Sequence, residues 1–283
     1  MAEARTFWVA GAATAAITSI GAPAESQVPA AAAAATYADL ADLALAAPVA
    51  AEVSVRRATA LKPERAPGLR PNHVRFYVEA GLVSLIRAPQ SLPARLAYLV
   101  DLPRDSKGKA PKLRKGTRWI LLAAPVPGRP GELQLVAPDA QLEAIPARSS
   151  TIRTIIREAS SASAPPRITG IGRAFHVPGA IRGESETQIF LQTARGTPVS
   201  LTVLRRPGQN PQWAVALGEI VDEAAAPPER DTLLWYRLAC GLPRALPRQS
   251  LADADSGAAA AIAADYRLVL ERLGPCARSR AGR

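Results

Sequence analysis

Alternating apolar and polar positions between Val49 and Ile145 predict a run of short β-strands. Each of five segments is bounded by breaks that contain Pro or Gly, namely EVSVRRATAL, HVRFYVEAGLVSLIRA, ARLAYLVDL, RWILLAAPV and GELQLVAP. The connection PVPGRPGE is short, so the last two strands should pair antiparallel. Five or six strands without intervening helices predict a small antiparallel β-barrel or sandwich over residues 49–146.

The remainder, residues 147–283, combines strand and helix patterns. The segments ETQIFLQTA, TPVSLTVLRR and QWAVALGEIVD are joined by short connections and predict a three-stranded antiparallel meander. Helical spacing predicts a helix in SSTIRTIIREAS, capped by Ser149 or Ser150. Two C-terminal helices are predicted, one with Pro228 in its first turn and one ended by Gly274 and Pro275. Because these helices can cover the apolar face of the meander, the predicted fold class is α+β and β-rich.

The N-terminal residues 1–24 have the pattern of a signal peptide. Phe7 to Ile20 is a charge-free run, and Ala22 and Ala24 fit the small residues before a cleavage point. The run is too short and alanine-rich to predict a membrane span, so no transmembrane helix is expected after signal removal. A disordered leader, or a retained leader that acts as an anchor, stays open as an alternative. Residues 25–48 are read as a low-complexity linker with one short helix from Tyr37 to Ala47.

The two cysteines support export. Cys240 and Cys276 each lie at the C-terminal end of a predicted helix, and no histidine lies near them to complete a metal site. An even pair behind an export signal predicts a disulfide, with Cα atoms within about 7 Å and helices that run parallel or cross near their C-termini. Two unpaired buried cysteines are the alternative. The protein is therefore predicted to be periplasmic or secreted.

The net charge of +11 is concentrated in one segment. Between Arg104 and Arg118 there are seven basic residues and one acid, and this segment holds four of the five lysines. It connects two predicted strands as a long hairpin loop, which can attract anions by screened charge. Its candidate anion-binding residues are Lys107, Lys109, Lys112, Arg114, Lys115 and Arg118. The alternative is a solvated hairpin tip without a binding role.

No catalytic, metal or cofactor site is predicted. His73 and His176 are the only histidines, and the chain lacks HExxH, C-x-x-C and phosphate-binding glycine motifs. The S-x-x-K match at Ser106 lies in a cationic, glycine-containing segment where its lysine should stay protonated. No catalytic residue is assigned, and the pattern favours a role other than catalysis.

These observations predict an exported cell-envelope protein with a non-catalytic binding or structural role. Its expected partner is an anionic envelope component, such as a lipid headgroup or lipopolysaccharide, which the lysine-rich loop contacts. One alternative is a periplasmic hydrolase with an unrecognised carboxylate or serine site. Another is a cytosolic nucleic-acid-binding β-barrel, although Trp119 is the only aromatic residue beside the loop, which argues against a nucleic-acid partner.

Overall fold

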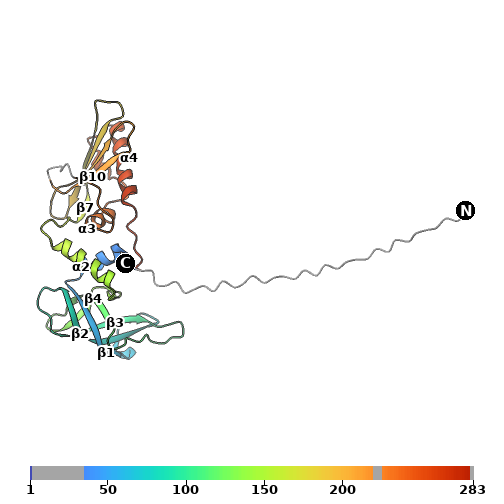
Figure 1. The fold of residues 1–283 in the computed structure, drawn as a ribbon, viewed down its shortest axis with the longest axis vertical. Helices are drawn as coiled ribbons and strands as arrows, with labels where there is room; N and C mark the ends of the chain where they lie inside the picture. Colours follow the sequence, from blue (N-terminus) through green and yellow to red (C-terminus); the bar gives the residue numbers. More distant parts are fainter. Residues whose placement is uncertain (2–34, 219–224, 281–283) are drawn as a thin grey trace. The chain divides into compact units, whose positions relative to one another are not determined.

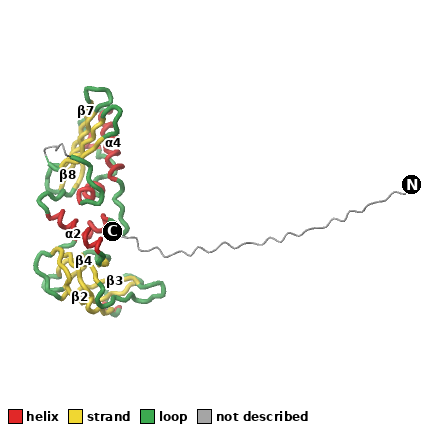
Figure 2. The backbone as a smooth tube through the Cα atoms, viewed as in Figure 1, coloured by secondary structure: helices red, strands yellow, loops and turns green. Residues whose placement is uncertain are grey.

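The computed structural model describes Met1 and residues 35–218 and 225–280. The predicted signal peptide and most of the predicted linker lie outside the described residues. From Ala35 onward the chain forms one compact unit. Within it the strands fall into two separate groups (Figures 1 and 2). No helix of the described part is long and apolar enough to cross a membrane.

The first group of strands is a closed barrel, as predicted. Its strands are β1 (Val49–Ala60), β2 (His73–Arg87), β3 (Arg95–Pro103), β4 (Arg118–Pro125) and β5 (Glu132–Leu135), with β6 (Gln141–Glu143) beside β4. The order β1-β2-β3-β5-β4 is closed by pairing of β4 with β1. The predicted antiparallel pairing of the strands around PVPGRPGE is confirmed between β4 and β5. Strands β3 and β5 pair in parallel, over two residues of each strand.

The alternation in β2 and β3 fills the barrel interior. Residues of β2 such as Val74 and Val78 point inward and are buried, as are Tyr98 and Val100 of β3. The residues between them face outward, and Leu99 is 46% exposed. Because successive side chains of a strand point to opposite faces, this pattern sets the register of the barrel wall.

Strand β4 is apolar on both faces because two helices cover its outer side. Ile120 and Leu122 point out of the barrel and pack against α1 (Tyr37–Ala46) and α2 (Pro146–Ser160). The helix predicted from Tyr37 is confirmed. The predicted serine cap of α2 is wrong: the helix begins at Pro146 without a side-chain cap, because proline is already suited to the first helical position. The division into domains near residue 147 stays a prediction.

The second group of strands is a separate four-stranded antiparallel sheet. It contains β7 (Ile168–Pro178), β8 (Ser185–Thr193), β9 (Val199–Arg205) and β10 (Gln212–Ala216), in the order β10-β9-β8-β7. The predicted meander is confirmed as β8, β9 and β10, and β7 is an additional strand. Residues 219–222 of the last predicted strand lie outside the described residues.

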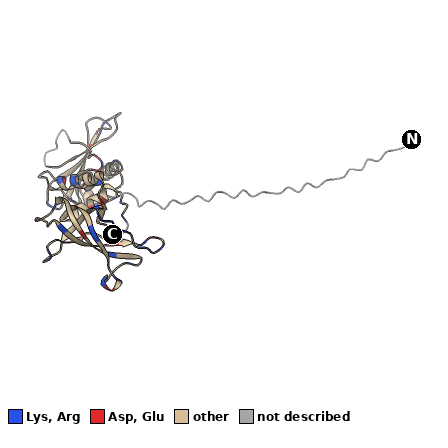
Figure 3. Cartoon of the chain, turned by 60° about the horizontal axis from the view of Figure 1, so that its bottom comes forward, with Lys and Arg blue, Asp and Glu red and all other residues tan. Residues whose placement is uncertain are grey.

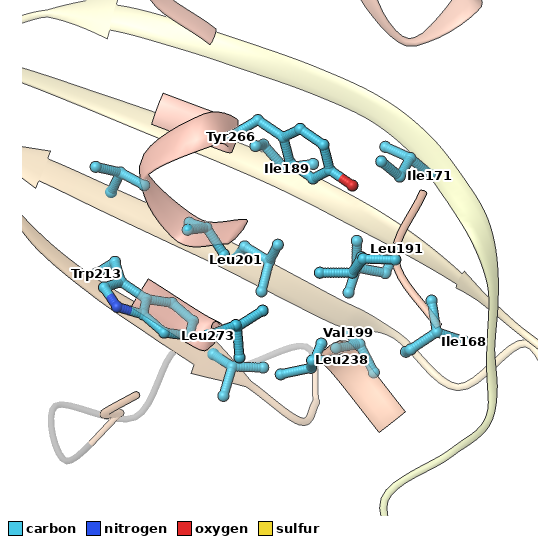
Figure 4. Close-up of a cluster of buried hydrophobic side chains, with 14 of the residues drawn as sticks. Ile168, Ile171, Ile189, Leu191, Val199, Leu201, Trp213, Leu238, Tyr266 and Leu273 are labelled. Atoms are coloured by element: carbon cyan, nitrogen blue, oxygen red, sulfur yellow. The ribbon is translucent and has the colours of Figure 1, made fainter. Parts of the chain in front are cut away.

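Two C-terminal helices, α3 (Leu233–Ala239) and α4 (Ser256–Leu273), contribute to the core of the second sheet. Figure 4 shows this core, where Tyr266 and Leu273 of α4 and Leu238 of α3 meet Ile189 and Leu201 of the sheet. The expected first turn of α3 at Pro228 is wrong. The helix begins at Leu233, because the side chain of Thr232 caps it by accepting from the backbone N–H of Trp235.

The two cysteines form a disulfide. Cys240 follows α3 and Cys276 follows α4, and their Cα atoms lie 5.2 Å apart, which confirms the expected distance. The indole N–H of Trp235 also donates to the carbonyl oxygen of Leu273 at 2.8 Å. The short helix α3 therefore meets α4 at the C-terminal end of α4.

Candidate functional site

The lysine-rich loop, residues 104–117, joins β3 to β4 but is not a hairpin. Strand β5 lies between β3 and β4 in the barrel, so the two strands do not pair. Near its start the loop contacts the chain before β2, where the N–H of Arg104 donates to the carbonyl of Asn72, and near its end the N–H of Gly116 donates to the carbonyl of Val55 in β1. The loop is therefore a crossover between non-adjacent strands, a correction to the predicted hairpin connection.

Hydrogen bonds to the side chain of Asp105 order the backbone in the first part of this loop. The carboxylate of Asp105 accepts the backbone N–H groups of Lys107 at 2.9 Å and Lys109 at 2.8 Å. Leu113 and Ala110 are partly buried and pack against the barrel core. The loop thus covers part of the barrel with its apolar residues while its charged side chains stay outside.

The predicted basic residues differ in their surroundings. Lys107, Lys109, Lys112, Arg114 and Lys115 are exposed, and none of them has an ion pair with another described residue. By contrast, Arg118 lies 2.6 Å from the carboxylate of Glu52, whose side chain is only 8% exposed. Basic positions also occur on the barrel strands (Figure 3). The structure therefore leaves five of the six predicted residues available for an anion.

Glu52 lies between two arginines. Arg118 contacts one carboxylate oxygen, and Arg153 of α2 contacts the other at 3.3 Å. Burial alone would raise the pKa of Glu52, but hydrogen bonds from Ser149, Arg118 and Arg153 outweigh burial and lower it. This network connects α2 to the barrel wall and is structural.

A second basic site was not predicted. A cavity of about 780 Å³ is lined by four arginines and one acid, and we call it the arginine cavity. Its charged residues come from five separate parts of the chain: Asp42 of α1, Arg87 at the end of β2, Arg167 before β7, Arg237 of α3 and Arg278 of the C-terminal segment.

The single carboxylate of the arginine cavity is already in use. Asp42 is 7% exposed, and it accepts from Arg278 Nε at 2.7 Å and Nη2 at 3.2 Å. The hydroxyl of Tyr236 also donates to it at 2.5 Å. Burial, together with this bond to Asp42, raises the pKa of Tyr236 to about 12, so the hydroxyl stays protonated and donates.

The histidines differ in their hydrogen bonding. His73 Nδ1 lies 2.8 Å from the carbonyl oxygen of Pro71. His176 Nδ1 lies 2.8 Å from the hydroxyl of Thr187, which donates to the buried carboxylate of Asp265 at 2.5 Å. Since that hydroxyl has one proton, it must accept from His176. In the described part of the chain, no three histidine, cysteine, aspartate or glutamate residues are grouped to hold a metal ion.

An opening of about 700 Å³ lies beside β3 and β5, and it contains two carboxylates. Asp101 is paired with Arg75 at 2.6 Å, and Glu132 is paired with Arg129 at 3.2 Å. Each acid thus has a cationic partner, and the opening gives no specific support to the hydrolase alternative.

Comparison with known proteins gives no indication of the function of these candidate sites. No protein-family model and no curated protein matches the chain at a significant level. Both candidate sites, the lysine-rich loop and the arginine cavity, are lined mainly by basic residues where they carry charge.

Proposed function

We propose that the protein is exported and has a non-catalytic binding role in the cell envelope, where the lysine-rich loop contacts an anionic surface. The observation that carries this proposal is the exposure of Lys107, Lys109, Lys112, Arg114 and Lys115 without ion pairs on a loop whose backbone is held by Asp105. A fixed backbone keeps the cations close together, so their potentials add at the surface of a partner.

Export is supported by two independent features. The Phe7–Ile20 run followed by Ala22 and Ala24 has the pattern of a cleaved signal, and these residues lie outside the described part. The disulfide between Cys240 and Cys276 is the kind of bond that persists in the periplasm or outside the cell. Acidic lipid headgroups and lipopolysaccharide are the anionic surfaces available there.

The test is binding of the full chain to lipid vesicles. We expect the quadruple variant K107Q/K109Q/K112Q/K115Q to bind vesicles of anionic phosphatidylglycerol at least about tenfold more weakly than the wild type at low salt. The difference should shrink above physiological ionic strength, where the Debye length falls below about 8 Å. Neutral phosphatidylcholine vesicles should bind neither protein.

A matched control removes the same charge elsewhere. The variant R182Q/R195Q/R206Q/R248Q changes four exposed arginines outside the loop. It should keep most of the vesicle binding, because its net charge equals that of the loop variant while the loop is intact. Equal loss in both variants would show that net charge alone matters, and equal binding by all three proteins would remove the loop from the function.

A further inference from the structure

The described residues that line the arginine cavity carry an excess of positive charge. Four guanidinium groups line it against the one carboxylate of Asp42, and that carboxylate is paired with Arg278. Three cations, Arg87, Arg167 and Arg237, therefore remain without an acidic partner among the described residues.

Two of these guanidinium groups have buried donors that are not used. The Nε atoms of Arg87 and Arg237 are inaccessible to solvent and have no acceptor among the described residues. Nη2 of Arg87 donates to the carbonyl oxygens of Ala44 and Ala47 at the end of α1. A buried polar group without a partner is costly, so such groups at a cavity call for an explanation.

The cations also disfavour one another. Burial lowers the pKa of Arg237, and the nearby charge of Arg167 lowers it further. The neighbouring acid of α2, Glu158, accepts from the backbone N–H of Leu233 at 2.9 Å and does not line the cavity. An anion from outside the chain would relieve this repulsion through the guanidinium groups that line the cavity.

We propose that the arginine cavity binds a phosphate-bearing ligand through Arg167, Arg237 and Arg87. The planar guanidinium presents paired N–H donors that match the oxygens of a phosphate, and the charge of three such groups, +3, exceeds the double negative charge of a phosphate monoester. The cavity volume of about 780 Å³ lies in the range of ligand sites and is much larger than a phosphate ion. The ligand therefore carries a phosphate on a larger organic body, either a free phosphorylated metabolite or a lipid headgroup.

The backbone at the wall of the cavity is closely packed. A Cβ at Gly241 would lie 2.4 Å from the carbonyl oxygen of Arg237, so only glycine fits where the chain leaves α3. Cys240 stands next to it in the wall and is bonded to Cys276, two residues before Arg278. The positions of Arg237 and Arg278 are thus tied to one another by the disulfide.

The test measures binding of pyrophosphate to the oxidised full chain by isothermal titration calorimetry at low salt. We expect saturable binding to the wild type, weakened roughly tenfold or more in R167Q and R237Q, since each loses a charge-assisted contact. Arg167 is exposed and its side chain has no hydrogen bond within the described part, so R167Q should fold even if R237Q does not. R267Q, on the exposed face of α4, is the charge-matched control and should bind as the wild type does.

Two further arms separate this site from the loop and identify the source of the phosphate. The variant K107Q/K109Q/K112Q/K115Q should keep its pyrophosphate binding, whatever happens to its vesicle binding. Dependence on Arg167 for binding to phosphatidic acid vesicles would assign a lipid headgroup, and dependence for pyrophosphate alone would assign a free phosphorylated compound. Absence of pyrophosphate binding to the wild type, or equal binding by wild type, R167Q and R237Q, would overturn the proposal.

Discussion

The replacement of Asp39 by asparagine tests how the C-terminal segment is held on the first helix. Asp39 of α1 is fully buried, and its carboxylate accepts the N–H of Ser279 at 2.9 Å and the hydroxyl of Ser279 at 2.7 Å. It also accepts the N–H and the hydroxyl of Thr36 at 3.0 and 2.9 Å. The carboxylate thus joins the start of α1 to a segment 240 residues further along the chain. All four donors meet the same oxygen, Oδ2, and the N–H of Arg280 lies 3.4 Å from Oδ1, so an asparagine that keeps its oxygen in place of Oδ2 sets its amide NH2 against the N–H of Arg280.

The expected loss of stability follows from burial and from the pKa. Burial alone would raise the pKa of Asp39, but hydrogen bonds from Ser279 and Thr36 outweigh it and lower the pKa from 3.8 to about 2. A carboxyl whose pKa is lowered this way contributes about 2 kcal/mol to the free energy of unfolding at neutral pH. In D39N the amide NH2 and the N–H of Arg280 face each other without an acceptor, which raises the cost to about 3 kcal/mol. For a protein of this size that is a melting temperature lower by roughly 6–12 °C.

The pH dependence provides a second measurement with a defined sign. Because the folded pKa of Asp39 lies below the unfolded value, its stabilisation is fully present above about pH 4 and is lost as the pH falls towards 2. Chemical denaturation at pH 7 and at pH 2.5 should therefore show a difference between wild type and D39N that shrinks on acidification.

The control variant is D253N, at a carboxylate that is 58% exposed and 3.7 Å from Arg173. It should change the free energy of unfolding by less than about 0.5 kcal/mol at either pH. If D39N were as stable as D253N at pH 7, the C-terminal segment would not be docked on α1 as described.

Two further predictions concern export and the disulfide. Protein purified from its native cells should begin at Glu25 or within a few residues and weigh two hydrogens less than the reduced chain; a cytosolic protein that begins at Met1 or Ala2 would contradict export. The double variant C240S/C276S should lose about 4 kcal/mol of stability in the chain-entropy model, measured by denaturant unfolding against the oxidised wild type. A loss below about 1 kcal/mol would mean that the reduced chain is already restrained in its unfolded state.

The barrel and the meander follow from local alternation, which explains why they could be predicted. Strand β7 was not predicted, because its sequence, ITGIGRAFHVP, contains two glycines and the strand has two register irregularities that interrupt the alternation. A Cβ at Gly172 would lie 3.3 Å from the carbonyl oxygen of Phe190 on β8, so the glycine there serves a close approach of two strands. Such an approach depends on the neighbouring strand and leaves no periodic pattern in the sequence.

The crossover between β3 and β4 was missed for a topological reason. The local sequence indicates that a charged connection joins the two strands. The strand order is set by long-range contacts, which here place β5 between β3 and β4. The hairpin expectation assumed that consecutive strands are neighbours, which is the common case and is wrong here.

The arginine cavity could not be found from sequence, because its residues 87, 167, 237 and 278 are spread along the chain in an arginine-rich background. The lysine cluster could be predicted because its residues lie close together in the sequence. Proximity in sequence, however, does not indicate whether side chains are buried: the lysines are exposed, whereas Arg87 and Arg237 each have a buried donor. A discrete ligand is therefore better matched to the cavity, and an extended surface to the loop.

The disulfide and the docked C-terminal segment together connect the arginine cavity to the redox state of the protein. Arg278 reaches Asp42 only because the chain after Cys276 returns to α1, where Ser279 is bound by Asp39. After reduction of the disulfide, only hydrogen bonds and ion pairs among the described residues would hold the C-terminal segment on α1. If Arg278 then left, the carboxylate of Asp42 would lose this ion pair while keeping its hydrogen bond from Tyr236, its charge would partly neutralise Arg87, Arg167 or Arg237, and it would compete with an incoming phosphate. The oxidised form is therefore the one in which the cavity keeps its full excess of positive charge, so the proposed ligand site and the proposed export of the protein support each other.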